Sequence, residues 1–265
     1  MKIKKALLLL ALIIAAAALA FVIESRTGLK SEVILGGADG AFVNSDNLKK
    51  PLDDYDGRIE AEDKYKDLDF PNIDIEDWNY ILINSSHVIK DNTPEVSKVG
   101  DLGVTFDKRA INQLVGLIQA ARRAGFEPYL AKGYVSYTAA IQQINEEATK
   151  LTAGGRLSFE EAVKIATKNS EVPGTSDHQT ALGVDITDKQ YDEYDYSKMN
   201  AKFFEWLDKH CAEYGFIKRY PSDKSGITGV DEPYHYRYVG AAAAKFIMEN
   251  GMCFEEFVNH YDYQK

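Results

Sequence analysis

The stretch that says most about this fold is Ser176-Asp177-His178-Gln179-Thr180-Ala181-Leu182-Gly183-Val184-Asp185-Ile186-Thr187. Residues 182–187 alternate as a strand does, with Val184 and Ile186 on one face and Asp185 on the other. A carboxylate on a strand that packs into a protein needs a partner, because burying it unpaired is costly. That partner is either a metal ion or an oppositely charged side chain.

A second stretch supplies further metal ligands and runs Glu232-Pro233-Tyr234-His235-Tyr236-Arg237-Tyr238-Val239-Gly240. His178, Asp185 and His235 together make two imidazoles and a carboxylate, the three-ligand set that leaves a catalytic zinc one open position. Glu232 lies outside this set, and a bend at Pro233 can bring it to the same site. There it could take a proton from a water molecule. The residues alone leave a purely structural role open as the alternative.

The segments around these two stretches predict an α+β fold. Helices come in runs and the later strands are hairpin-like, so we expect a small antiparallel sheet, flanking helices and a zinc site in a central cleft. The expected strands lie at 80–84, 128–131, 182–187, 216–220 and 234–239. The expected helices run from Asp107 to Gly125, from Tyr137 to Gly154, onward from a Ser158/Glu161 capping box, and over 197–213 and 240–250.

The chain begins with a basic and then apolar segment that is typical of export. Lys2, Lys4 and Lys5 precede an uninterrupted apolar run at 6–23, which fits either a cleaved signal peptide or an uncleaved membrane anchor. The basic end would stay in the cytoplasm, so the rest of the chain would be extracytoplasmic, anchored or secreted to the cell wall. We expect an acidic stalk at 24–75 and a catalytic domain at 76–265.

The composition disfavours several kinds of partner. The chain has 31 basic residues, three of them in the export segment, against 41 acidic ones. This acidic balance disfavours binding to nucleic acid or to an anionic membrane surface. Membrane contact would be made through the N-terminal segment if it is not cleaved, and we expect a monomer. Cys211 and Cys253 are too few for a disulfide framework, although the two could pair. Each has apolar neighbours in the sequence, so we expect two buried thiols.

The two stretches resemble the signature of the VanY-like D-alanyl-D-alanine metallocarboxypeptidases. They share Ser-x-His with an Asp seven residues after the His, and then Glu-Pro-aromatic-His-x-Arg-Tyr-Val-Gly, within a likeness that covers about 78–261. The resemblance implies a zinc (Zn2+) peptidase that removes D-alanine from the peptidoglycan stem peptide. It implies His178, Asp185 and His235 as zinc ligands and Glu232 as the catalytic base and then acid. The substrate contacts expected with it are Ser176, Tyr134, Ser136 and Arg237.

The chain departs from this family in the segment that holds substrate. The family has Gly-Tyr-Arg-Ser-Tyr and a Gln three residues later, whereas this chain has Gly133-Tyr134-Val135-Ser136-Tyr137 and then Ala140. The Val135 side chain carries no charge and donates no hydrogen bond. Lys132 or Arg237 could supply the lost charge. A D-Ala-D-Ala dipeptidase, or an L,D- or endo-acting wall peptidase, is therefore the alternative enzyme.

Other classes of protein fit the sequence less well. The chain has no Ser-x-x-Lys, which a serine D,D-peptidase needs, and no His-Glu-x-x-His, which a thermolysin-like site needs. A zinc-stabilised wall-binding module without catalysis is the alternative from a different class. Such a module would have no need of Glu232.

Overall fold

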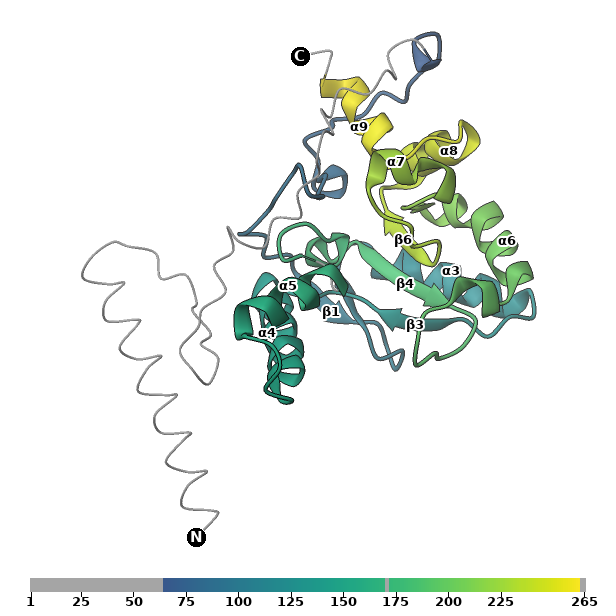
Figure 1. Cartoon of the computed structure of the whole chain (residues 1–265). Helices are drawn as coiled ribbons and strands as arrows, with labels where there is room; N and C mark the ends of the chain where they lie inside the picture. Colours follow the sequence, from purple (N-terminus) through teal and green to yellow (C-terminus); the bar gives the residue numbers. More distant parts are fainter. Residues whose placement is uncertain (1–63, 170–171, 263–265) are drawn as a thin grey trace.

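A computed structural model describes residues 64–169 and 172–262 of the chain (Figure 1). The export segment at 1–23 and most of the predicted stalk at 24–75 lie outside the described residues. Within the described part, no helix combines the length and the apolar character that crossing a bilayer requires.

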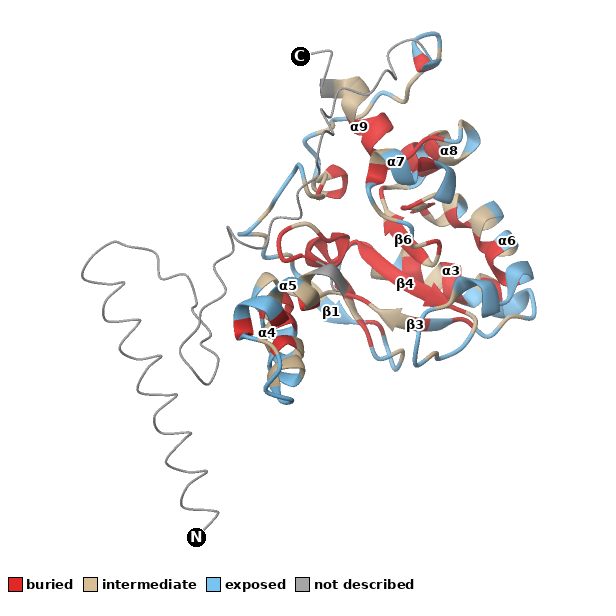
Figure 2. Ribbon diagram, in the orientation of Figure 1, coloured by how far each residue is buried: buried red, intermediate tan, exposed pale blue. Residues whose placement is uncertain are grey.

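The centre of the fold is a four-stranded antiparallel sheet, which confirms the predicted mixture of helices with a small antiparallel sheet. Its spatial order is β3 (Tyr129–Lys132), β4 (Gly183–Thr187), β6 (His235–Tyr238) and β5 (Phe216–Lys218). β4 is buried along its entire length (Figure 2). A separate two-stranded sheet pairs β1 (Val96–Lys98) with β2 (Thr105–Asp107).

The two faces of the four-stranded sheet carry different residues. Val184, Ile186 and Tyr236 on one face belong to an apolar core that also contains side chains of two helices. These helices are α3 (Ile111–Arg123) and α6 (Ala201–His210). Because side chains alternate along a strand, Gly183 and Asp185 of β4 face the other way, together with their partners on β6. This second, polar face of the sheet is where the predicted ligands lie.

The remaining helices are α4 (Tyr137–Thr152), α5 (Phe159–Asn169), α7 (Ser225–Thr228), α8 (Ala241–Glu249) and α9 (Phe254–Asp262). α4 and α5 pack on each other, and α8 and α9 share a second cluster. The predicted capping box of α5 is present, because Ser158 N donates to Glu161 Oε2 at 2.9 Å and Glu161 N donates to Ser158 Oγ at 3.3 Å.

Two of the predicted elements are wrong. The segment 80–84 is not a strand: residues 78–80 form a short 3-10 helix, and the Ile81 carbonyl accepts a hydrogen bond from Arg237 Nη2 at 2.9 Å. The buried Arg237 side chain thus provides the hydrogen bond that a neighbouring strand would provide to a strand residue. The helix expected from Asp107 begins only at Ile111, because Asp107 ends β2 and its carboxylate binds the side chain of Arg109.

The packed part of the chain begins before residue 76, the start predicted for the domain. Tyr65 is 5% exposed, and its hydroxyl donates to Glu256 Oε1 at 3.2 Å. The ring of Phe70 stacks on that of His260, with ring centroids 3.4 Å apart. Residues 65 and 70 thus belong to the cluster of α8 and α9, although they lie in the segment predicted as a stalk.

Both cysteines are buried and free, as predicted. Cys211 lies in the core shared by α3 and α6. Burial raises the pKa of its thiol to about 12, and burial also raises the pKa of the Cys253 thiol. Neither thiol is therefore a reactive group at neutral pH.

Candidate metal centre

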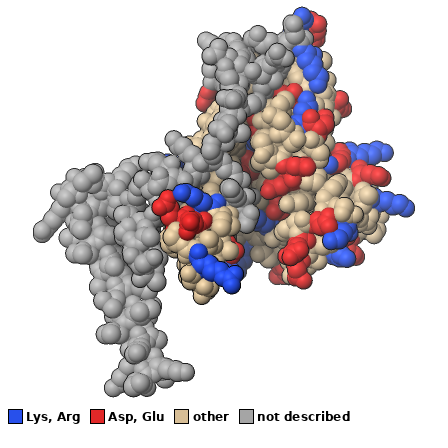
Figure 3. All heavy atoms as spheres, viewed as in Figure 1, with Lys and Arg blue, Asp and Glu red and all other residues tan. Residues whose placement is uncertain are grey.

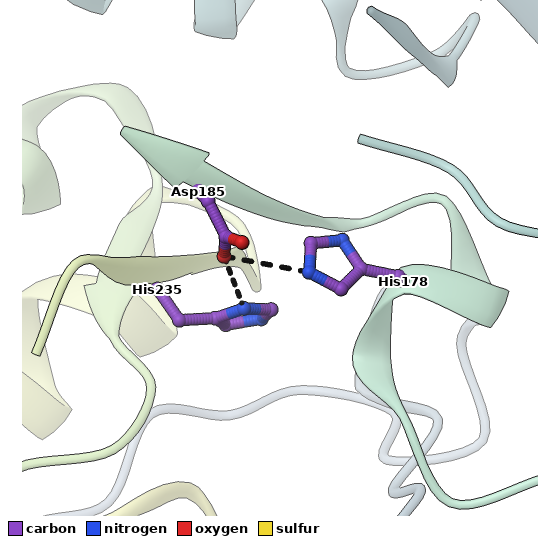
Figure 4. Close-up of side chains that lie close together, drawn as sticks. All are labelled: His178, Asp185 and His235. Atoms are coloured by element: carbon purple, nitrogen blue, oxygen red, sulfur yellow. Dashed lines mark hydrogen bonds and ion pairs between the residues drawn. The ribbon is translucent and has the colours of Figure 1, made fainter. Parts of the chain in front are cut away.

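The three predicted ligands meet on the polar face of the sheet (Figure 4). His178 lies on a short 3-10 helix, η3 (Asp177–Thr180), while Asp185 lies on β4 and His235 on β6. His178 Nε2 lies 3.4 Å from Asp185 Oδ1, and His235 Nδ1 lies 2.8 Å from the same oxygen. All three side chains are buried, and they offer one donor atom each within 4.8 Å of one another.

Backbone pairing fixes each of these side chains. Asp185 and His235 are direct partners in the register of β4 and β6, so their side chains stand next to each other on one face. η3 is capped by Ser176, whose Oγ accepts from His178 N at 3.2 Å. The His178 carbonyl accepts from Val135 N at 3.1 Å, which ties η3 to the segment before α4.

The donor set fits a zinc ion. Tetrahedral zinc, with bonds of about 2.0–2.1 Å, separates its nitrogen and oxygen ligands by roughly 3.3 Å. The His178–Asp185 contact has this length, and the shorter His235–Asp185 contact is an imidazole–carboxylate hydrogen bond that a cation between the two groups would replace. Burial opposes the ionisation of Asp185, but the two imidazoles lower its pKa below the ordinary value. The carboxylate is therefore in its charged, metal-binding form.

Glu232 is held beside the ligands by a tight turn. Its carbonyl accepts a hydrogen bond from His235 N at 3.0 Å, and Pro233 occupies the second position of the turn, where its fixed φ fits. The predicted bend at Pro233 is therefore present. Burial raises the pKa of Tyr220 well above its ordinary value, and the charge of Glu232 adds to this effect. The Tyr220 ring itself lies 5.1 Å from the His235 ring.

A buried network of charges lies under the ligand site. Asp177 is fully buried and accepts from Arg219 Nε at 2.7 Å and from Arg237 Nη1. Arg219 also makes a bidentate ion pair with Glu255: Nη1 donates to Oε2 at 2.8 Å and Nη2 donates to Oε1 at 2.7 Å. Burial opposes the ionisation of Asp177, but the two guanidinium groups lower its pKa. The network joins η3, β6 and α9 at one point.

The far edge of the His235 ring packs on Asp177 and Gly183. Asp177 Oδ2 lies 3.8 Å from His235 Nε2. At this distance the carboxylate faces the Nε2 edge of the ring without a hydrogen bond, while the Nδ1 edge faces Asp185. A Cβ atom at Gly183 would lie only 2.7 Å from the same Nε2. Glycine at this position therefore makes the space that the ring occupies.

Comparison with known proteins identifies the family to which this chain is similar. Residues 103–241 match the family model described as VanY, D-alanyl-D-alanine carboxypeptidase. This chain belongs to that family. A D-alanyl-D-alanine carboxypeptidase of Enterococcus faecalis is 36% identical to it over 187 residues, which make up 70% of this chain and 68% of the relative. The resemblance predicted from the two sequence stretches is confirmed.

Two solved VanY structures share the fold. One is a mutant of the vancomycin-resistance D,D-pentapeptidase VanY in complex with Zn(II), which covers 69% of this chain and 100% of its own, with 35% identity and a TM-score of 0.56. The other is VanYB in complex with D-alanine-D-alanine, which covers 69% of this chain and 98% of its own, with 36% identity and a TM-score of 0.56. The VanY family consists of zinc metallopeptidases, so the predicted enzyme class and cofactor are confirmed.

Three further residues predicted for substrate binding lie around the ligand site of this VanY-family chain. Ser176, as the cap of η3, is only 7% exposed. Tyr134 and Ser136 are half-buried in the segment that joins β3 to α4. Ser136 caps α4 by accepting from Ala139 N at 3.1 Å. Their substrate contacts remain predictions, and each residue also has a place in the local backbone structure.

Arg237, the fourth of these residues, has a different role in the structure. It is fully buried, and its guanidinium donates to Asp177 and to the carbonyls of Asn79 and Ile81, at 3.2 and 2.9 Å. Its Nε atom donates to the Tyr238 carbonyl at 3.1 Å. The guanidinium is thus engaged with protein groups, and Arg237 supports the fold in place of the substrate contact suggested by the sequence.

The sequence analysis missed several parts of the site. Asp177 stands between two residues of the quoted motif, and a charged residue there was a usable signal for a buried partner. Arg219 and Glu255 gave no such signal, because they are 36 positions apart. The segment 191–196 was not among the predicted parts of the site, yet it places the half-exposed Tyr194 in a stack with Tyr234, with ring centroids 4.8 Å apart.

Proposed function

We propose that this chain is an extracytoplasmic zinc D,D-carboxypeptidase that removes the C-terminal D-alanine from peptidoglycan stem peptides. The observation that carries the proposal is the buried convergence of His178, Asp185 and His235, with Glu232 tied to His235 by one turn. Membership of the VanY family supports the class of reaction. The basic and apolar segment at 1–23 supports the location outside the cytoplasm.

The residues of the site divide the reaction among them. His178, Asp185 and His235 would hold the zinc ion, which when bound supplies Lewis-acid activation of water and of the scissile carbonyl. The Glu232 carboxylate accepts a proton from the attacking water and then gives it to the amine of the departing D-alanine. Asp177 lies behind the His235 ring, with its Oδ2 3.8 Å from Nε2.

Release of D-alanine tests the proposed function directly. The purified chain should release one equivalent of D-alanine from a synthetic pentapeptide that ends in D-Ala-D-Ala. A chelator should abolish the release and added zinc should restore it, while a pentapeptide ending in L-Ala should stay intact. Release of the D-Ala-D-Ala dipeptide would instead identify a dipeptide-releasing enzyme. A zinc-loaded chain that releases nothing would be the binding module.

Gly183→Ala should weaken zinc binding without unfolding the chain. The new Cβ would lie 2.7 Å from His235 Nε2 and 2.9 Å from Asp177 Cβ, and both neighbours are buried. The ring has to move away from Asp185, and displacing the support of a metal ligand costs about 10–100-fold in metal affinity. Competition with a chromophoric chelator measures this affinity. Gly226→Ala is the matched control, since a Cβ there meets nothing within 4 Å. Equal zinc affinity in both variants would contradict the proposed ligand geometry.

A further inference from the structure

We propose that Tyr129 and Tyr194 form an aromatic subsite that binds a cationic side chain of the substrate, on the second residue before the cut bond. The inference rests on the proposed function and extends it to the part of the peptide that remains after D-alanine leaves. Among the described residues, three of the four exposed large hydrophobic side chains are tyrosines: Tyr129, Tyr194 and Tyr196. The first two lie beside the ligand site, and the third provides a control.

Tyr129 lies on the ligand face of the sheet. It pairs with Thr187 in the register of β3 and β4, and the next pair, Leu130 with Ile186, belongs to the apolar core. Because side chains alternate along a strand, Tyr129 and Thr187 lie on the opposite face, which carries Asp185. The register shift between the two strands comes only after Leu130. Thr187 follows Asp185 by two strand positions, so Tyr129 lies about 7 Å along the sheet from the ligand site.

Tyr194 brings a second ring to this place from the loop after β4. Its ring stacks on that of Tyr234, the residue before the ligand His235, with centroids 4.8 Å apart and an interplanar angle of 27°. Burial raises the pKa of Tyr194, and interactions with Asp185 and Tyr129 raise this pKa further, so its hydroxyl lies near both residues. Tyr194 is nevertheless 45% exposed, which leaves ring surface for a ligand.

The loop that carries Tyr194 has a defined shape. Asp188, at its start, accepts from the Tyr191 hydroxyl at 3.0 Å and from Asn200 N at 3.2 Å. These two bonds connect the beginning of the loop to its end. Since the loop is already ordered, placing a substrate against Tyr194 costs little conformational entropy.

The charge around the two rings favours a cation. Residues 188–200 include four acidic side chains and two lysines. Both lysines are engaged: Lys189 Nζ lies 5.1 Å from the centre of the Tyr191 ring, and Lys198 binds Asp195 at 2.7 Å. The two carboxylates of the ligand site would balance the charge of a bound zinc ion, so the loop leaves the local charge negative. The face of a tyrosine ring itself attracts an ammonium group.

Distance decides which part of the substrate reaches the rings. Past the scissile carbonyl carbon, the departing D-alanine extends only roughly 4 Å to its last carbon atom, which is less than the distance to Tyr129. The rings therefore contact the part of the peptide that remains. Residues of an extended peptide follow one another at about 3.5 Å. A side chain as long as lysine, on the second residue before the cut bond, can cover the remaining distance.

Two peptides test this inference. The zinc-loaded chain is compared on pentapeptides that end in D-Ala-D-Ala and carry either lysine or norleucine, which lacks the ammonium group, at the second residue before the cut bond. The wild-type chain should prefer lysine by about 5–30-fold in kcat/KM, the range of one cation–π contact. The difference should lie mainly in KM, because this side chain is the same in the ground state and the transition state.

Variants assign the preference to the rings. Tyr194→Leu should lower it by at least about threefold, and the double variant Tyr129→Leu/Tyr194→Leu should bring it to within about twofold of unity. Tyr194→Phe keeps the ring and should keep most of the preference. Tyr196→Leu is the matched control, since the Tyr196 ring packs edge-on against Phe204 of the apolar core, with centroids 4.9 Å apart, and the preference should not change. A preference that survives the double variant would overturn the inference.

Binding without turnover separates this inference from the proposed function. The zinc-loaded Glu232→Gln chain should bind the lysine peptide about 5–30-fold more tightly than the norleucine peptide in calorimetry. A peptide with Nε-acetyl-lysine should bind like the norleucine peptide, because it keeps the length and lacks the charge. Equal Kd values for the lysine and norleucine peptides would overturn the inference, even if the wild-type chain releases D-alanine. A wild-type chain that releases no D-alanine would overturn the proposed function, and the ratio of Kd values would still decide whether the rings select a cation.

Discussion

Glu232→Gln should bind zinc as the wild-type chain does and release D-alanine roughly 10²–10⁴-fold more slowly. Glutamine keeps the size of the side chain but cannot take a proton from water or return one to the leaving amine. The turn that places residue 232 depends on its backbone carbonyl and on Pro233, so the substitution leaves the geometry of His235 unchanged. The measurement pairs single-turnover kinetics on the pentapeptide with zinc analysis of the same sample.

Two further variants make this result specific. His178→Ala removes a ligand, so it should lose zinc and activity together. Asp231→Asn changes the neighbouring exposed carboxylate, which accepts from Ser222 Oγ at 2.9 Å, and should keep normal turnover. A zinc-loaded Glu232→Gln chain with the wild-type rate would remove Glu232 from the mechanism and leave its role to another group.

Asp177→Asn should destabilise the fold by about 3–5 kcal/mol, the cost of breaking a buried ion pair. Asparagine has nearly the same volume, so the effect isolates the charge. Without it, Arg219 keeps Glu255 as a partner, while Arg237 is left fully buried with only carbonyl acceptors. A loss of this size is a large part of the stability of a typical domain. In urea it should lower the unfolding midpoint by more than about 1 M.

The unfolding measurement is made in the presence of chelator, so that it reports the charge network and not zinc affinity. Glu160→Gln is the control, since it removes one carboxylate from the exposed Lys164–Glu160 pair on α5. Exposed ion pairs contribute little to stability, because water and salt screen them, so the unfolding midpoint of Glu160→Gln should equal that of the wild-type chain.

Charged side chains of both signs are mixed over the visible surface (Figure 3), so the loss of a single exposed charge should have little effect on stability. A midpoint for Asp177→Asn that matches this control would show that the two guanidinium groups do not depend on Asp177.

The position of the N-terminal segment shows where local patterns mislead. Residues 64–75 contain three aspartates and two lysines and have no helical or strand period, so the sequence predicts them as part of the solvated stalk. The structure nevertheless packs Tyr65 and Phe70 against α8 and α9. The five apolar residues of this segment (Tyr65, Leu68, Phe70, Ile73 and Ile75) find packing partners only when the far end of the chain folds beside them. Hydrophobic periodicity reflects only residues that are close in sequence, so it does not reveal contacts with distant parts of the chain.

The sequence by itself predicted strands at 182–187 and 234–239, the capping box of α5 and the three candidate ligands that the structure brings together. Alternation, capping and the spacing of His and Asp are local properties, so they are visible before any packing is known. Only the tertiary structure decided that Asp185 and His235 are direct partners in the sheet, and that Arg237 is a buried partner of Asp177. Strand register and the burial of a charge depend on which segments meet in space. Arg237, plausible as a substrate ligand in the sequence, therefore receives a structural role from the fold.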